Sequence, residues 1–72
     1  MRIHINGEPR EFPQSSLSLN ELIDMLSLPV QRIAVEVNKA IVRRLDWPAT
    51  TLKEGDQIEI VHFVGGGEDR RQ

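Results

Sequence analysis

The chain has 72 residues, of which 39% are hydrophobic and 28% are charged, and its formal net charge at pH 7 is −2. A chain of this length buries one hydrophobic core and leaves no surface for a second, so we expect one domain. No hydrophobic run approaches the ~20 residues needed to span a bilayer, and no basic cluster with interleaved aromatic residues indicates nucleic-acid binding. The absence of cysteine excludes disulfides, thiolate nucleophiles and most zinc sites.

A hairpin is predicted at the N-terminus. Ile3 and Ile5 alternate with polar residues, and Asn6-Gly7 is the dipeptide best suited to a two-residue turn with positive φ. The return strand over residues 8–12 contains Pro9, which cannot donate a ladder hydrogen bond, so we expect Pro9 on an edge strand or at a position that makes no ladder hydrogen bond. The alternating start lacks the basic, hydrophobic and small-residue segments of a secretory signal, which favours a cytoplasmic location.

One helix is predicted next. Ser18 and Glu21 have the spacing of a capping box, in which each residue satisfies a free backbone N–H of the other. Hydrophobic residues then recur at i, i+3, i+4 and i+7, namely Leu19, Leu22, Ile23 and Leu26. Pro29 prevents the helix from continuing. We expect this helix to lie across a sheet.

The second half of the chain predicts three further strands. Residues 32–37 are rich in β-branched side chains, and Asn38-Lys39 is a tight turn before residues 40–42. Residues 45–52 have the signals of an irregular segment, in which we expect the single tryptophan, Trp47, to pack in the core. A turn at residues 53–56 precedes the last strand, at residues 57–64.

This order of elements predicts an α+β fold: a mixed sheet of about five strands with one main helix packed on one face. If the first and last strands are parallel central neighbours, the C-terminus leaves the sheet at one end. We therefore expect a domain at residues 1–64, a flexible glycine arm at residues 65–67 and a polar tail at residues 68–72.

The glycine run Gly65-Gly66-Gly67 is the unusual feature of the sequence. A segment without side chains can enter a narrow channel and adopt φ values barred to other residues, so a partner enzyme could reach a carboxylate at its end. The alternative is a flexible connection to the polar tail with no chemistry of its own.

The last strand offers a surface beside this arm. Val61 and Phe63 share one side of the strand and are candidate partner-binding residues, whereas Ile58, Ile60 and Val64 share the other side and are expected to face the helix. For Phe63, an interface role and an ordinary core role both stay open at this point.

Three stretches of sequence resemble one known family. They are Asn38-Lys39-Ala40-Ile41-Val42, the run from Gly55-Asp56 to Val61, and Phe63-Val64-Gly65-Gly66-Gly67. Their order and spacing, with Trp47 between the first two, resemble ThiS, the sulfur carrier family of thiamin biosynthesis, over nearly the whole chain. The resemblance implies a ubiquitin-like β-grasp fold and a reactive carboxyl-terminal glycine, here Gly67, with Gly66 and Gly65 as its arm.

The chemistry implied by this resemblance needs partners. An adenylyltransferase similar to ubiquitin-activating enzymes would use ATP and Mg²⁺ to adenylate the glycine, which then becomes a thiocarboxylate that donates sulfur to thiazole synthase. Because the chain has no cysteine, the sulfur would come from a donor fed by a cysteine desulfurase. No phosphate-binding glycine motif is present, so we expect no bound cofactor and a substrate rather than an enzyme. His4 and His62 lack metal-ligand spacing, and we assign no metal.

The tail at residues 68–72 departs from the family pattern, in which a glycine normally ends the chain. As written, the terminal carboxylate belongs to Gln72, and we hypothesise that a peptidase removes these five residues after Gly67. Three alternatives stay open: the small subunit of molybdopterin synthase, a carrier for another metabolite, and a non-catalytic β-grasp interaction module.

Overall fold

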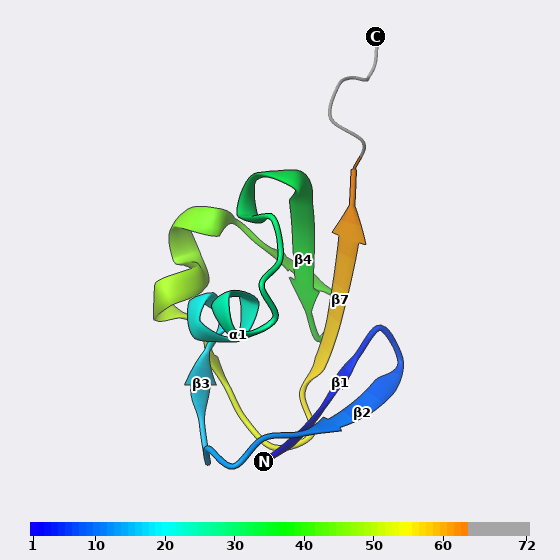
Figure 1. The fold of residues 1–72 in the computed structure, drawn as a ribbon, viewed down its shortest axis with the longest axis vertical. Helices are drawn as coiled ribbons and strands as arrows, with labels where there is room; N and C mark the ends of the chain where they lie inside the picture. The colour runs from blue at the N-terminus through cyan, green and yellow to red at the C-terminus, as the bar shows by residue number, and fades with distance from the viewer. Residues whose placement is uncertain (64–72) are drawn as a thin grey trace, which may run out of the picture.

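The computed structural model describes residues 1–63, so Val64, the glycine arm and the polar tail lie outside the described residues. The elements follow in the order β1 (Arg2–Ile5), β2 (Glu8–Glu11), β3 (Leu17–Ser18), α1 (Leu19–Met25), η1 (Val30–Arg32), β4 (Ile33–Val37), β5 (Ala40–Val42), η2 (Arg44–Ala49), β6 (Thr51–Leu52) and β7 (Gln57–His62). Figure 1 shows α1 on one side of the sheet and β7 running along the full height of the domain.

The main sheet has five strands in the order β2-β1-β7-β4-β5. β1 and β7 are parallel neighbours, whereas the β1–β2, β4–β5 and β4–β7 pairs are antiparallel. The predicted mixed sheet, its parallel pair and the edge position of Pro9 on β2 are therefore confirmed. Because β1 and β7 point the same way, β7 ends at the far end of the sheet from Met1 (Figure 1).

Both predicted hairpin turns are confirmed. Asn6 and Gly7 have φ values of 51° and 84°, and Asn38 and Lys39 have φ values of 52° and 73°. Two consecutive residues with positive φ match the right-handed twist of the strands that they join.

The predicted helix and capping box are also confirmed. Glu21 N donates to Ser18 Oγ at 3.0 Å, and Ser18 N donates to Glu21 Oε1 at 2.9 Å.

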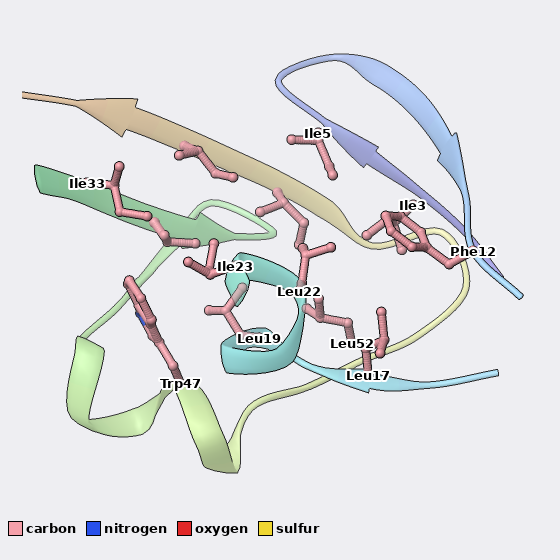
Figure 2. Close-up of a cluster of buried hydrophobic side chains, with 13 residues drawn as sticks. Ile3, Ile5, Phe12, Leu17, Leu19, Leu22, Ile23, Ile33, Trp47 and Leu52 are labelled. Carbon is pink, nitrogen blue, oxygen red and sulfur yellow. The ribbon is translucent and has the colours of Figure 1, made fainter. Parts of the chain in front are cut away.

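The buried hydrophobic side chains are Ile3, Ile5, Phe12, Leu17, Leu19, Leu22, Ile23, Ile33, Val35, Trp47, Leu52, Ile58 and Ile60. Figure 2 shows this cluster around α1, with the main sheet on one side of the helix and Trp47, Leu17 and Leu52 beside it. The seven-residue helix thus owes its stability chiefly to packing, because isolated helices shorter than ~12 residues are marginal in water.

The segment expected to be irregular contains regular structure. Residues 44–49 form the 3₁₀ helix η2, and β6 pairs with β3 in a second, two-stranded sheet. Neither short element leaves a periodic pattern in the sequence. Trp47 is in the core as predicted: it is 2% exposed, and its Nε1 donates to the Val42 carbonyl at 3.0 Å. Its polar atom is thereby satisfied as the ring is buried.

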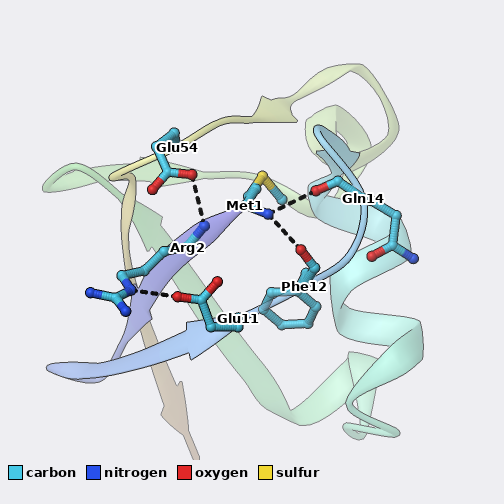
Figure 3. A network of polar contacts seen from close by, with 6 residues as sticks. All are labelled: Met1, Arg2, Glu11, Phe12, Gln14 and Glu54. Atoms are coloured by element: carbon cyan, nitrogen blue, oxygen red, sulfur yellow. Dashed lines mark hydrogen bonds and ion pairs between the residues drawn. The ribbon is translucent and has the colours of Figure 1, made fainter.

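Polar contacts hold the end of the sheet where β1 begins (Figure 3). The amino group of Met1 donates to the carbonyl oxygens of Phe12 and Gln14. Arg2 N donates to Glu54 Oε1 at 2.9 Å, and Arg2 Nε pairs with Glu11 Oε2 at 2.6 Å. The bond to Glu54 joins the first strand to the turn that leads into β7, and the other contacts join the N-terminus to β2 and to the segment that follows it.

Candidate partner-binding surface at the end of strand β7

Strand β7 is held on both sides along the sheet. Its register with β4 runs from Val37↔Ile58 to Ile33↔His62, and its parallel register with β1 includes Ile5↔Ile58. Past the last strand residue, Phe63 N donates to the Arg32 carbonyl at 2.9 Å. Backbone hydrogen bonds therefore hold the chain up to Phe63, two residues before the glycine run.

The side chain of Asn6 extends the support of β7 beyond the end of β1. Ile60 N donates to Asn6 Oδ1 at 2.7 Å, and Asn6 Nδ2 donates to the Ile60 carbonyl at 3.2 Å. Asn6 N itself donates to the Ile58 carbonyl at 2.8 Å. The amide of Asn6 thus takes the place of the next peptide group of β1, which has turned away into the hairpin.

A second asparagine supports the start of β7. Gln57 N donates to Asn38 Oδ1 at 3.0 Å, and Asn38 Nδ2 donates to Asp56 Oδ1 at 3.1 Å. The other carboxylate oxygen of Asp56 accepts from Lys53 N at 2.9 Å, and Asp56 is 7% exposed. Sequence reasoning missed these contacts. The available signals were an asparagine in each tight turn and an aspartate directly after Gly55.

Val61 and Phe63 are exposed, and their neighbours on β7 are buried. Ile58 and Ile60 are 1% and 7% exposed, whereas Val61 and Phe63 are 57% and 50% exposed. The predicted facing of Ile58 and Ile60 is confirmed, and Phe63 is not a core residue. That Val61 and Phe63 bind a partner stays a prediction.

Other hydrophobic side chains adjoin these two residues. Val61 lies opposite Ala34 in the β4–β7 register, and Ile41, which is 74% exposed, lies opposite Glu36 in the β4–β5 register. A hollow with a volume of about 230 Å³ is lined by Ala34, Ile41 and Phe63 among other residues, and Arg43 and Arg44 also line it. We call Ala34, Ile41, Val61 and Phe63 the apolar patch; it lies where β7 ends.

The histidines and acidic residues of the described part are the candidates for a metal site. Within residues 1–63, no three side chains of His, Asp or Glu are grouped so that they could hold a metal ion. His4 lies opposite Gln57 and His62 opposite Ile33, so the two imidazoles are on separate parts of the sheet. His4 Nδ1 is buried without a hydrogen-bond partner. The predicted reactive residues Gly65, Gly66 and Gly67 lie outside the described residues. No helix in the described part is long and hydrophobic enough to cross a membrane.

Comparison with known proteins gives consistent matches. A sequence profile of the ThiS family matches residues 3–67. The chain is 32% identical over 65 residues to the sulfur carrier protein ThiS of Bacillus subtilis, a match that covers 90% of this chain and 98% of the relative. The crystal structure of the thiamine biosynthesis protein ThiS from Geobacter metallireducens superposes with a TM-score of 0.84 at 35% identity and covers 93% of this chain and 100% of that chain.

The chain also resembles part of two thiazole synthases, which are longer proteins. The chain is 46% identical over 68 residues to a thiazole synthase from Magnetococcus marinus, a match that covers 94% of this chain and 21% of the relative. A thiazole synthase from Paramagnetospirillum magneticum is likewise covered over 21% of its length. The chain thus spans about a fifth of the length of these two relatives.

These matches confirm the β-grasp fold expected from the sequence and favour ThiS over the small subunit of molybdopterin synthase. Because the family profile extends from Ile3 to Gly67 and a relative of nearly equal length is 32% identical, the chain belongs to the ThiS family.

Proposed function

We propose that this chain is a sulfur carrier for thiamin biosynthesis, in which the carboxylate of Gly67 becomes a thiocarboxylate. One observation supports this function above the others: the family profile extends over residues 3–67 and so ends at the last residue of the glycine run. The chain acts as the substrate of its partners and not as a catalyst.

The chemistry follows from the low reactivity of a carboxylate. Its oxygen attacks the α-phosphorus of ATP and releases pyrophosphate, which gives an acyl-adenylate with AMP as a good leaving group. The terminal sulfur of a donor persulfide then attacks the acyl carbon and expels AMP, which gives an acyl disulfide. A thiol attacks the donor-side sulfur of this disulfide, so the thiocarboxylate leaves and the thiol and the donor are oxidised to a disulfide. The adenylyltransferase holds ATP and Mg²⁺, and a donor fed by a cysteine desulfurase supplies the sulfur, because this chain has no cysteine.

Two further partners complete the proposal. Thiazole synthase accepts the sulfur, and the support for this is the similarity to proteins of that name. A peptidase cleaves the peptide bond between Gly67 and Glu68, because Gly67 has a free carboxylate only when no residue follows it. All these steps take place in the cytoplasm.

In this proposal the domain of residues 1–63 binds the partner and sets the position from which the glycine arm starts. Ordering a glycine arm inside a partner costs roughly 1–2 kcal/mol per residue, so the domain must supply docking energy from its surface. The firmly held end of β7 sets the starting point of the arm, and Val61 and Phe63 of the apolar patch contact the partner.

Genetic complementation tests the proposed function. In a bacterial strain that lacks its own ThiS, residues 1–67 should restore growth without added thiamin, and residues 1–65 should not. A strain that lacks the small subunit of molybdopterin synthase should not be rescued. Failure of residues 1–67 in the first strain, with normal amounts of folded protein, would count against the proposal, as would rescue of the second strain.

A further inference from the structure

Two carboxylates lie directly opposite each other on the open face of the sheet. Glu36 of β4 and Glu59 of β7 are register partners, so their side chains share one face. Val35 and Ile60, the next residues on the two strands, point to the opposite face and are in the core. Glu36 and Glu59 therefore lie on the face turned away from α1. Glu36 is partly buried and Glu59 is exposed.

The fold itself gains nothing from this arrangement. Like charges directly opposite each other destabilise an antiparallel strand pair. The only ion pair within residues 1–63 joins Arg2 and Glu11, so neither Glu36 nor Glu59 has a cationic partner there. Both carboxylates line a hollow with a volume of about 480 Å³ whose other charged residue is Lys39, so its net charge is 1 − 2 = −1. A glutamine at either position would fill the same space without the repulsion.

The hollow is continuous with the apolar patch. Val61 lines the hollow and belongs to the patch, and Glu59 precedes it by two residues on the same face of β7. A protein that takes up the arm after Phe63 and covers the patch must also come close to the two carboxylates. An adenylating partner that holds the phosphates of ATP near the end of the arm needs positive charge around its channel, which complements an acidic surface.

We propose that Glu36 and Glu59 form an acidic docking site that binds an arginine or lysine side chain of the adenylating partner, beside the contacts of the apolar patch. This inference rests on the proposed function. A guanidinium placed between two carboxylates removes their mutual repulsion, so the charge arrangement that weakens the free domain strengthens the complex.

The test compares binding and stability in the same variants. The full-length chain and its Glu36→Gln/Glu59→Gln variant are titrated with the purified ThiS adenylyltransferase from the same organism, at low salt and at about 1 M salt, where the Debye length is about 3 Å. We expect the variant to bind about tenfold more weakly at low salt and equally at high salt. Its urea unfolding midpoint should rise, because the repulsion is gone.

The control for a change of charge elsewhere on the sheet is Glu8→Gln, which removes one exposed negative charge from edge strand β2, two strands away from β7. It should bind like the wild type at both salt concentrations. A variant that is more stable and binds more weakly cannot be explained by misfolding. Equal affinity of the double variant and the wild type at low salt would overturn the docking site while leaving the sulfur-carrier function intact, since the wild type would still bind and be loaded. A wild-type chain that does not bind the adenylyltransferase would overturn both.

Discussion

Asn6 and Asn38 perform the same task at the two ends of β7. Each occupies a hairpin turn with positive φ, and each turns its side-chain amide toward the backbone of β7. Asparagine tolerates this backbone conformation better than other non-glycine residues, and its amide can both donate and accept. The sequence alone predicts the turns, because Asn6-Gly7 and Asn38-Lys39 are local signals. It does not predict the amide contacts, because residues 6 and 60 come together only through the pairing of strands.

The contribution of the Asn6 amide can be separated from that of the turn. Asn6→Gly keeps a residue suited to positive φ and removes the bonds to Ile60, which should lower the free energy of unfolding by about 1–3 kcal/mol. Asn6→Ala should cost about 1 kcal/mol more, because alanine is strained at this φ. Urea denaturation of both variants measures these differences. Equal stability of Asn6→Gly and the wild type would show that the amide bonds contribute nothing.

At the scale of elements, α1 ends in a motif that normally contains glycine. Ser27 has a φ of 56° after the last helical turn. Its N–H donates to the Asp24 carbonyl at 3.0 Å, and Leu28 N donates to the Ile23 carbonyl at 3.3 Å. This pair of bonds is the Schellman pattern, in which the residue after the cap is left-handed. The sequence offers Pro29 as the visible stop, but the helix ends earlier, at Met25.

Replacement of Ser27 by glycine should therefore stabilise the domain. We expect Ser27→Gly to raise the free energy of unfolding by about 0.5–1 kcal/mol, because glycine adopts this φ without strain. Ser27→Ala is the control and should give no gain, since alanine keeps the Cβ atom that causes the strain. The midpoints of thermal unfolding compare the three proteins. A destabilised Ser27→Gly protein would mean that the serine side chain makes a stabilising contact that outweighs the strain.

At the scale of the whole molecule, the position of the arm depends on strands that are far apart in sequence. β1 and β7 open and close the described domain, and their parallel pairing sends the end of β7 away from Met1 (Figure 1). The alternation of β7 predicts that Val61 and Phe63 share a side. It does not predict that Glu59 lies opposite Glu36, because the register of β7 against β4 follows from the packed core and not from either strand alone.

Removal of the last two glycines should separate folding from function. A chain that ends at Gly65 should unfold at the same urea concentration as one that ends at Gly67, because residues 1–63 contain the whole described core. It should accept no sulfur from the adenylyltransferase with ATP and a sulfur donor, because its terminal carboxylate no longer reaches the adenylation site. Sulfur loading of the shortened chain would exclude the arm from the mechanism.

The most direct measurement is the intact mass of the protein recovered from its own cells, before and after incubation with the adenylyltransferase, ATP and a sulfur donor. It reports the terminal residue and the cargo together. The account predicts a species that ends at Gly67 and gains the mass difference of one oxygen replaced by sulfur. A chain that still carries residues after Gly67 and keeps its mass after the incubation would contradict the account and favour a β-grasp interaction module.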